Sequence, residues 1–323
     1  MRCRGAFTLI EILVSLMIFS IVGVAMLGIM FMATELYRSG ETGRAANDES
    51  VAVMAALDDD IARMVPHAAG GWVYVDVSNP GVGNGTIADA DPDGGTLLAF
   101  KITRRDRSQV QASGEGTQTI VAWWVDKNRQ LRRAERAVPP RTTVDHDDDF
   151  DALELMVVDA SIRDTWPIIT TGCLHFSAYL STDVKVRLAT SDWSSLDAIP
   201  QAGPPHCTGP EHGMAFPEAI RVTTVLTGGG RFAPTGFLVS KMDKSSTDAF
   251  RIAGIKALPT ASGAMLRVDD EWIGYDGYNG KAISMTGTDP WVGRGRRRSS
   301  DVTHDPKAVV RLGYTHSLVR ILR

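Results

Sequence analysis

The sequence lacks the short motifs that mark most enzyme active sites. It contains no G-x-S-x-G, no Walker phosphate loop, no H-E-x-x-H and no Cys-x-x-Cys pair. It is also short of positive charge, with 34 lysines and arginines against 38 acidic residues. These absences predict a protein that is not an enzyme and has no catalytic residues, and nucleic acid is not expected as a general partner.

What the chain does have is one long apolar run near its start, with a single acid just inside it. Residues 12–33 are almost wholly apolar, interrupted only by two serines and two glycines, and Glu11 precedes them. About 20 apolar residues are enough to cross a bilayer, and a carboxylate within it costs about 2.5 to 3.5 kcal/mol. A new chain end at Phe7 would place a free amine about one helical turn from Glu11.

Two simpler explanations of this run fit it less well. A secretory signal has a shorter apolar core that is followed by a small-residue cleavage site, and no such site follows here. An uncleaved signal anchor agrees with the length and with the placement of Arg2 and Arg4, but it leaves Glu11 unexplained.

The residues GAFTLIE, followed by this apolar run, resemble the N-terminus shared by type IV pilins and the pseudopilins of type II secretion. The resemblance implies a prepilin leader over residues 1–6, cut between Ala6 and Phe7 by prepilin peptidase, and N-methylation of Phe7. It also implies that Glu11, the fifth residue of the mature chain, guides assembly by attracting the terminal amine of a neighbouring subunit. Ala6 departs from the glycine that is usual before the cut.

The same segment predicts where the protein resides. With Arg2 and Arg4 on the cytoplasmic side, a single span gives an inner-membrane protein whose globular part lies in the periplasm. Gly23 and Gly28 would let the helix bend or unwind locally, or let another helix approach closely.

Helical signals continue beyond the apolar run. Val53, Leu57 and Ile61 form an apolar stripe at helical spacing, with the acidic run 58–60 on its wet side, and Pro66 ends the pattern. The sequence therefore predicts a long helix whose second half packs on a soluble domain.

These signals divide the chain into five parts. They are residues 1–6 as leader peptide, 7–33 as transmembrane and assembly helix, 34–66 as its periplasmic continuation, 67–227 as a pilin-like sheet domain and 228–323 as a C-terminal β-rich extension. Gly40 and Gly43 would permit a break in the continuation.

After Pro66 the pattern changes to short β-branched and aromatic runs separated by Gly, Asp and Pro clusters. Residues 119–136 predict a hairpin that turns at Asp126-Lys127-Asn128. The other expected strands lie in GGWVYVDV, TLLAFKIT, CLHFSAYL and AIRVTTVLT. The predicted fold class is α+β, with a long N-terminal helix packed on antiparallel sheet.

Weaker motifs narrow the resemblance. Five features spread over residues 7–227 resemble the J-type minor pseudopilin and the W-type minor pilin. They are LDDDIARMV, QLRRAER, LHFSAYL, Trp193 and FPEAIRVTTVLT. The resemblance implies a subunit that starts or caps a type II secretion pseudopilus at its tip, with I- and K-type partners and major pseudopilins. The alternative is a minor pilin of a type IV pilus, active in adhesion or DNA uptake.

Residues 228–323 begin with the boundary Gly228-Gly229-Gly230, after which the sequence predicts short strands with tight connections. The segment 270–312 resembles a hairpin unit of assorted surface and tail-like proteins, in which a G-E-x-I-x-Y strand precedes an RG-x-x-x-T-x-x-H loop. An added β module and an elaborated edge of the pilin sheet both fit this pattern.

No metal site and no cofactor are expected. The acidic run 145–151, with His146 inside it, offers oxygen ligands, but it lacks the glycine and the closing glutamate of an EF-hand loop. A solvated loop is therefore favoured, and calcium is the alternative. His206, Cys207 and His212 provide too few ligands for a zinc site.

The C-terminal part carries a basic cluster of Arg294, Arg296, Arg297 and Arg298. Such a run is most often a solvated loop, and its alternative role is to bind phosphate or an acidic partner surface.

Cysteine use leaves one further question open. Cys3 leaves with the leader, so Cys173 and Cys207 would remain in an oxidising compartment. A disulfide between them and two buried free thiols both fit the sequence.

Loss of Arg2 and Arg4 with the leader also changes the net charge. It leaves 32 basic residues, two fewer than 34, against 38 acidic ones, for a formal charge of about −6.

Overall fold

In this computed structural model the chain divides into two compact units, Met1–Ala45 and Ala46–Arg323. The described residues are 9–66, 69–76, 81–82, 85–86, 97–103, 118–138, 147–163, 165–181, 206–208, 217–227, 236–244, 246, 248–254, 258, 264–279, 282–285, 292–296 and 301–322.

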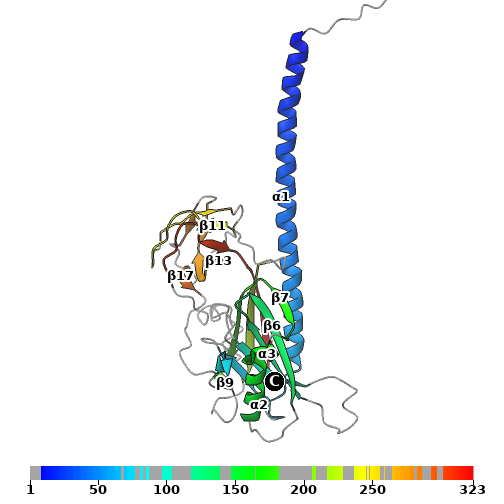
Figure 1. Ribbon diagram of the computed structural model, residues 1–323, viewed down its shortest axis with the longest axis vertical. Helices are drawn as coiled ribbons and strands as arrows, with labels where there is room; N and C mark the ends of the chain where they lie inside the picture. The colour runs from blue at the N-terminus through cyan, green and yellow to red at the C-terminus, as the bar shows by residue number, and fades with distance from the viewer. Residues whose placement is uncertain are drawn as a thin grey trace, which may run out of the picture. The chain divides into compact units, whose positions relative to one another are not determined.

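Helix α1 (Leu9–Ala62) is continuous over 54 residues (Figure 1). It passes through Gly40 and Gly43 without the break that the sequence would permit. Each glycine weakens a helix by about 1 kcal/mol but keeps its backbone N–H donor, so the flanking turns can carry the helix through. The chain leaves the helix before Pro66, as predicted.

A six-stranded antiparallel sheet forms the centre of the second unit, in the order β7-β6-β5-β4-β1-β9. Its strands are β1 (Val73–Asp76), β4 (Leu97–Thr103), β5 (Gln118–Val125), β6 (Gln130–Val138), β7 (Ile168–Thr171) and β9 (His206–Thr208). The predicted hairpin is confirmed as β5 and β6. Its turn is held by the Asp126 carboxylate, which accepts hydrogen bonds from the N–H groups of Asn128 and Gln130 at 2.9 Å.

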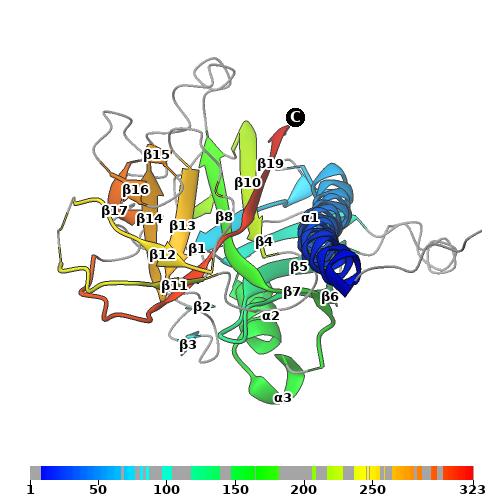
Figure 2. The same cartoon turned by 90° about the horizontal axis from the view of Figure 1, so that it is seen from above.

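The central strands of this sheet, β4 and β5, are buried on both faces, because other elements cover each face. On one face the predicted stripe of Val53, Leu57 and Ile61 on α1 packs in the same core cluster as Phe100 and Trp123. The opposite face packs against helix α2 (Asp147–Val157), which is followed by the short α3 (Ala160–Arg163). Figure 2 shows α2 beside the strands of this sheet. All eight residues of β5 are consequently buried.

Two further sheets complete the unit. A three-stranded antiparallel sheet has the order β19-β10-β8, formed by β8 (Cys173–Ser181), β10 (Ala219–Leu226) and β19 (Tyr314–Ile321). The other has the order β12-β11-β18-β13-β14-β17, formed by β11 (Gly236–Leu238), β12 (Ile252–Ala253), β13 (Ala264–Val268), β14 (Glu271–Tyr275), β17 (Gly293–Arg296) and β18 (Val309–Arg311). Two short pairs are β2 (Gly81–Val82) with β3 (Gly85–Thr86), and β15 (Gly277–Tyr278) with β16 (Ile283–Ser284).

The second six-stranded sheet is inserted between two strands that pair with each other. It lies in the chain between β10 and β19, and Leu226 at the end of β10 is the register partner of Tyr314 at the start of β19. The segment expected as an extension therefore returns its last strand to the sheet that contains β8 and β10. The fold is α+β, as the sequence predicts.

The wet side assigned to the acidic run 58–60 is wrong for one residue. Asp60 is 1% exposed. Its carboxylate accepts hydrogen bonds from Trp123 Nε1 at 3.0 Å, from Arg133 Nε at 2.7 Å and from Arg63 Nη2 at 2.8 Å. Periodicity alone could not reveal this, because all three donors lie outside the helix or at its end.

The solvated loop expected for 145–151 is also wrong where the structure describes it, because residues from Asp147 onward are helical. Asp149 is buried, and its Oδ2 accepts from Lys101 Nζ at 2.8 Å and from Trp72 Nε1 at 3.1 Å. A buried lysine needs such a partner, since a lone charge in the interior is strongly unfavourable. Leu153 and Val157 lie at helical spacing, and this spacing is the signal in the sequence from which α2 could have been predicted.

Asp60→Asn is expected to lower the free energy of unfolding by about 3 to 5 kcal/mol, because Arg133 would lose its buried counter-charge. The measurement is urea unfolding of the full-length chain in detergent, followed by tryptophan fluorescence. The matched control is Asp59→Asn, one residue away and with a 57% exposed side chain, which should change stability by less than about 0.5 kcal/mol. Equal effects of the two substitutions would contradict the assignment of Asp60.

Candidate functional site

The first part of α1 presents a long apolar surface. The span Leu9–Thr34 has 26 residues, none of them buried, and Leu9 and Phe19 are 78% and 77% exposed. At 1.5 Å per residue it is about 39 Å long, which exceeds the roughly 30 Å of hydrocarbon in a bilayer. This single N-terminal helix is long and apolar enough to anchor the chain in a membrane.

Two hydroxyl groups of the span form hydrogen bonds within the helix itself. Ser20 Oγ donates to the carbonyl oxygen of Leu16, and Thr34 Oγ1 donates to that of Met30, both at 2.8 Å. These bonds back to the preceding turn satisfy each hydroxyl within the helix, where no water would be at hand. Glu11 lies in the first turn of α1 and is therefore the acid at the start of the span.

Gly23 and Gly28 are open positions on this helix. A Cβ built on either would meet nothing within 4 Å, so no contact described within the subunit requires a glycine there. The helix is regular through both in the subunit, so bending or unwinding would arise only on packing, and the open surface equally suits close approach by another helix.

Ala6 and Phe7, at the expected cleavage and methylation site, lie outside the described residues. The side chains of His206 and Cys207, the whole of His212 and most of the basic cluster also lie outside the described residues. Cys173 is buried with a free thiol. Burial raises the pKa of this thiol to about 12, so it stays protonated and unreactive. Among the described residues, no group of three or more His, Cys, Asp or Glu could hold a metal ion.

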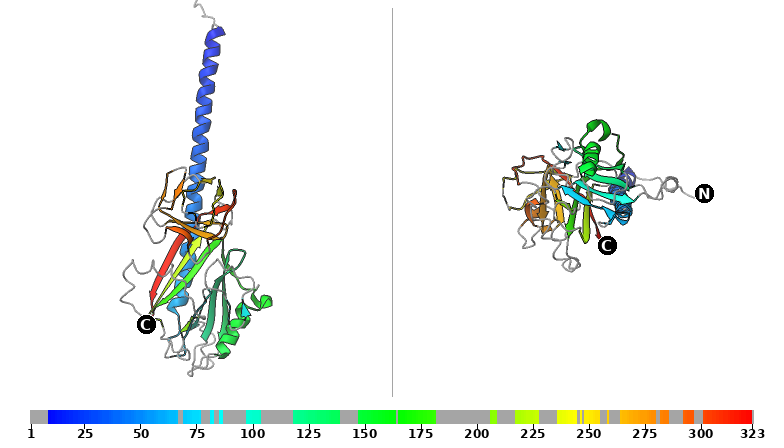
Figure 3. Two further views of the ribbon diagram at one scale, coloured as in Figure 1. Left: turned by 90° about the vertical axis from the view of Figure 1, so that its left-hand side faces the viewer. Right: turned by 90° about the horizontal axis from the view of Figure 1, so that it is seen from below.

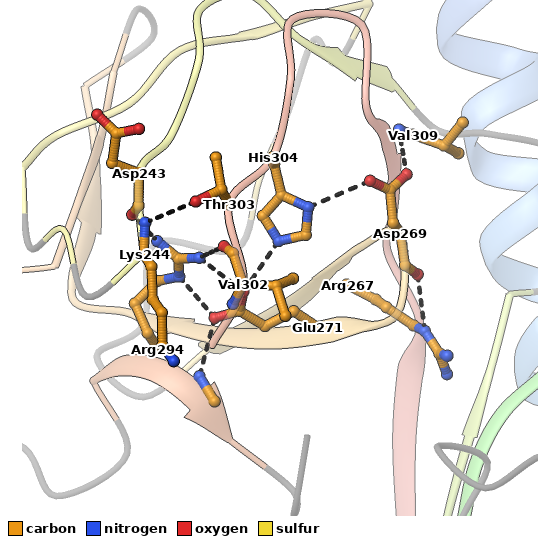
Figure 4. A network of polar contacts seen from close by, with 11 residues as sticks. Asp243, Lys244, Arg267, Asp269, Glu271, Arg294, Val302, Thr303, His304 and Val309 are labelled. Carbon is orange, nitrogen blue, oxygen red and sulfur yellow. Dashed lines mark hydrogen bonds and ion pairs between the residues drawn. The ribbon is translucent and has the colours of Figure 1, made fainter. Parts of the chain in front are cut away.

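The inserted sheet contains a buried polar network that the sequence did not assign (Figure 4). The Glu271 carboxylate, on β14, accepts from Arg294 Nε at 2.5 Å, from Arg294 Nη2 at 2.6 Å and from His304 Nε2 at 2.9 Å. The backbone N–H groups of Gly295 and Val302 add bonds of 2.9 and 3.1 Å. One buried acid therefore joins β14, β17 and the loop before β18.

His304 is held between two carboxylates. Its Nδ1 lies 3.1 Å from Asp269 Oδ2, opposite the Glu271 contact of Nε2. A ring with an acceptor at each nitrogen is best satisfied as the imidazolium, in which both nitrogens donate. Asp269 is fixed in turn by the N–H of Val309 at 2.9 Å.

This arrangement shifts two pKa values in opposite directions. Burial by itself would raise the pKa of Glu271, but the hydrogen bonds from His304, Arg294 and the backbone outweigh it and lower the pKa to about 2. Burial by itself would lower the pKa of His304, and the bonds to Glu271 and Asp269 outweigh that effect and raise it. The network therefore favours a charged acid beside a charged ring.

Three residues of the segment 270–312, Glu271, Arg294 and His304, meet in this one network. Arg294, expected in a solvated patch or free for a partner, instead has a side chain only 5% exposed. The signal in the sequence was the glutamate at the start of EWIGY, a run that is otherwise uncharged.

A separate group of side chains, outside the Glu271 network, holds the inserted sheet against the three-stranded sheet. Trp272 packs with Leu174 and Val225, and the buried Arg267 donates from Nη1 to the carbonyl oxygen of Leu174 at 3.0 Å. The Arg267 guanidinium also lies 6.0 Å from the centre of the Trp272 ring, within range of a cation–π interaction. These contacts fix the position of the inserted sheet against β8 and β10.

The stability that His304 supplies is expected to be lost as the pH rises. Because its folded pKa is raised above the ordinary value of about 6.5, its contribution is complete below that pH and disappears as the pH climbs through the folded value. The contribution of Glu271 is complete above its ordinary value of 4.5 and is lost as the pH falls towards about 2. Stability from the network should therefore be greatest between about pH 4.5 and 6.5.

The measurement is urea unfolding of the full-length chain in detergent between pH 5 and 9, compared with His304→Gln. The variant should be less stable at pH 6 and should lose less stability than the unmodified chain as the pH rises. Parallel pH profiles would show that His304 is not the titrating group.

Comparison with known families found a match to the prokaryotic N-terminal methylation motif over residues 1–27. The comparisons with curated proteins and with solved structures found no match. The motif marks type IV pilin-like substrates of prepilin peptidase, which assemble with other pilins and are structural rather than catalytic. This chain carries such an N-terminus on an exposed apolar helix.

Proposed function

We propose that this chain is a minor pseudopilin, assembled at the tip of a type II secretion pseudopilus to initiate or cap the filament. The observation that carries the proposal is the methylation motif over residues 1–27, which leads into an apolar helix with no buried residue in its span. A helix of this kind has two environments that would cover it, lipid before assembly and neighbouring helices after it.

The assembly step follows from the position of Glu11. Prepilin peptidase removes residues 1–6 on the cytoplasmic face of the inner membrane, and the amine of Phe7 is methylated. In the filament, the amine of one subunit meets the Glu11 carboxylate of another. A pair of opposite charges in a low-dielectric core is tolerated only at the matching height, so it sets the register of the helices.

The size of the head supports a place at the tip. The unit Ala46–Arg323 contains two six-stranded sheets and one three-stranded sheet. A head of this size is difficult to repeat at every position of a tightly packed helical filament, because neighbouring heads would clash. Partners of the I and K types are therefore proposed beside it, with major pseudopilins below.

The alternative is a minor pilin of a type IV pilus, active in adhesion or DNA uptake. For DNA, the arginine cluster would be the contact. One of its members, Arg294, is already engaged by Glu271 and by the carbonyl oxygen of Asp243 at 2.9 Å. This internal use reduces the charge available to phosphate and supports the pseudopilin proposal instead.

Glu11→Ala is expected to leave leader removal largely intact while preventing entry into filaments. The physical reason is that the amine of a neighbouring subunit would lose its counter-charge inside the helix bundle. The measurement is immunoblotting of sheared filaments and of membranes from the host. The matched control is Glu41→Ala, a glutamate of the same helix outside the span, which should enter filaments normally. Normal entry of Glu11→Ala would contradict the proposed assembly step.

Ala6→Gly is expected to increase the rate of leader removal, because glycine is the usual residue before the cut in pilin-like proteins. Pulse–chase labelling of the full-length chain would measure the rate. Mass analysis of the mature N-terminus should find a methylated Phe7 in both versions. A mature protein that still begins with Met1, in a host with the peptidase, would exclude processing of this type.

A further inference from the structure

Strand β19 forms an edge of the three-stranded sheet (Figure 3). It pairs with β10 over eight consecutive residues without a register shift, and none of the other described strands pairs with its second edge. A regular edge of this length offers a row of backbone donors and acceptors to another strand.

The residues that face outward can be identified from the ladder. The N–H of Leu322 donates to the carbonyl oxygen of Glu218 at 2.8 Å, so this pair is hydrogen-bonded. Bonded and non-bonded pairs alternate along an antiparallel ladder. The N–H and C=O groups that point away from β10 therefore belong to every second residue of β19, namely Thr315, Ser317, Val319 and Ile321.

Proteins usually protect such an edge with proline, charge, a bulge or short length. β19 has no proline and no bulge against β10, and its only lysine or arginine is Arg320. That side chain is turned away to pair with Asp58 of α1. Val319 and Ile321 are instead 47% and 50% exposed; on β10, Ala219 opposite Ile321 is buried and Arg221 opposite Val319 is half-buried. Both the backbone and the side chains of this edge suit an apolar strand.

The position of β19 beside α1 indicates where the strand that pairs with it would come from. Besides the Arg320 pair with Asp58, Leu318 and Leu322 pack in the core cluster that contains Leu57 of α1. β19 therefore lies along the helix that assembles with other pilins. A subunit packed beside this part of α1 would bring its own head next to β19.

We propose that β19 pairs in the filament with an extended apolar strand of the neighbouring subunit's head, which continues the three-stranded sheet across the subunit boundary. The inference rests on the proposed filament function. It adds a main-chain contact between heads to the contact between helices, and it would fix the rotation of one head against the next.

Val319→Pro tests the pairing, because it removes one outward N–H and places a ring against the incoming strand. Proline is tolerated at such positions of edge strands, so thermal unfolding of the full-length variant should stay close to that of the unmodified chain. Its entry into sheared filaments should fall at least about fivefold. Val319→Thr keeps the N–H and should lose clearly less. Equal losses from the two variants would assign the contact to the side chain and overturn strand pairing.

Hydrogen exchange of the unmodified full-length chain gives a second test that needs no variant. The amides of Ser317 and Val319 should exchange at least about tenfold more slowly in filaments than in the detergent-solubilised subunit, while those of Leu318 and Arg320 are slow in both. Equal rates for the outward amides would overturn the proposal and leave the filament function intact. Protection at high concentration in detergent alone would assign the edge to a second copy and also overturn it. A chain found in no filament would overturn the proposed function itself.

Discussion

The carboxylate of Asp60 is the contact on which the head's attachment to α1 depends. The apolar stripe of α1 buries surface against the sheet, but such contacts are non-directional and would tolerate rotation or a shift along the helix axis. Asp60 accepts from Trp123 on β5 and from Arg133 on β6, two donors with fixed positions in the sheet. Rotation or a shift of this part of the helix would break these bonds, so the acid adds direction to the apolar contacts.

A buried acid paired with a basic side chain also joins other elements of the fold. Asp149 on α2 is paired with Lys101 on β4, and Glu271 on β14 is paired with Arg294 on β17. A buried ion pair adds little net stability relative to a well-packed apolar contact, but breaking one is costly because it leaves a charge unpaired. Each of these acids ties its element to another that is not adjacent to it in the chain.

The inserted sheet has a defined place in this scheme. Because its two ends meet at Leu226 and Tyr314, the chain can leave and rejoin the three-stranded sheet without disturbing the pairing of β10 with β19. Trp272 and Arg267 then fix the inserted sheet against β8 and β10. The insertion therefore adds surface to the head without changing the place of β19 beside β10.

Local sequence was sufficient for the α+β class, the helix through Ile61, the β5–β6 hairpin and the N-terminal methylation motif, because each depends on periodicity or on adjacent residues. It was insufficient for Asp60 and Arg294, which read as solvated charges. Whether a charged side chain is buried depends on which distant element supplies its partner, and the pairing of β19 with β10 likewise joins strands about 90 residues apart. Contacts of that kind have no signature in the spacing of neighbouring residues, so they came from the packed fold alone.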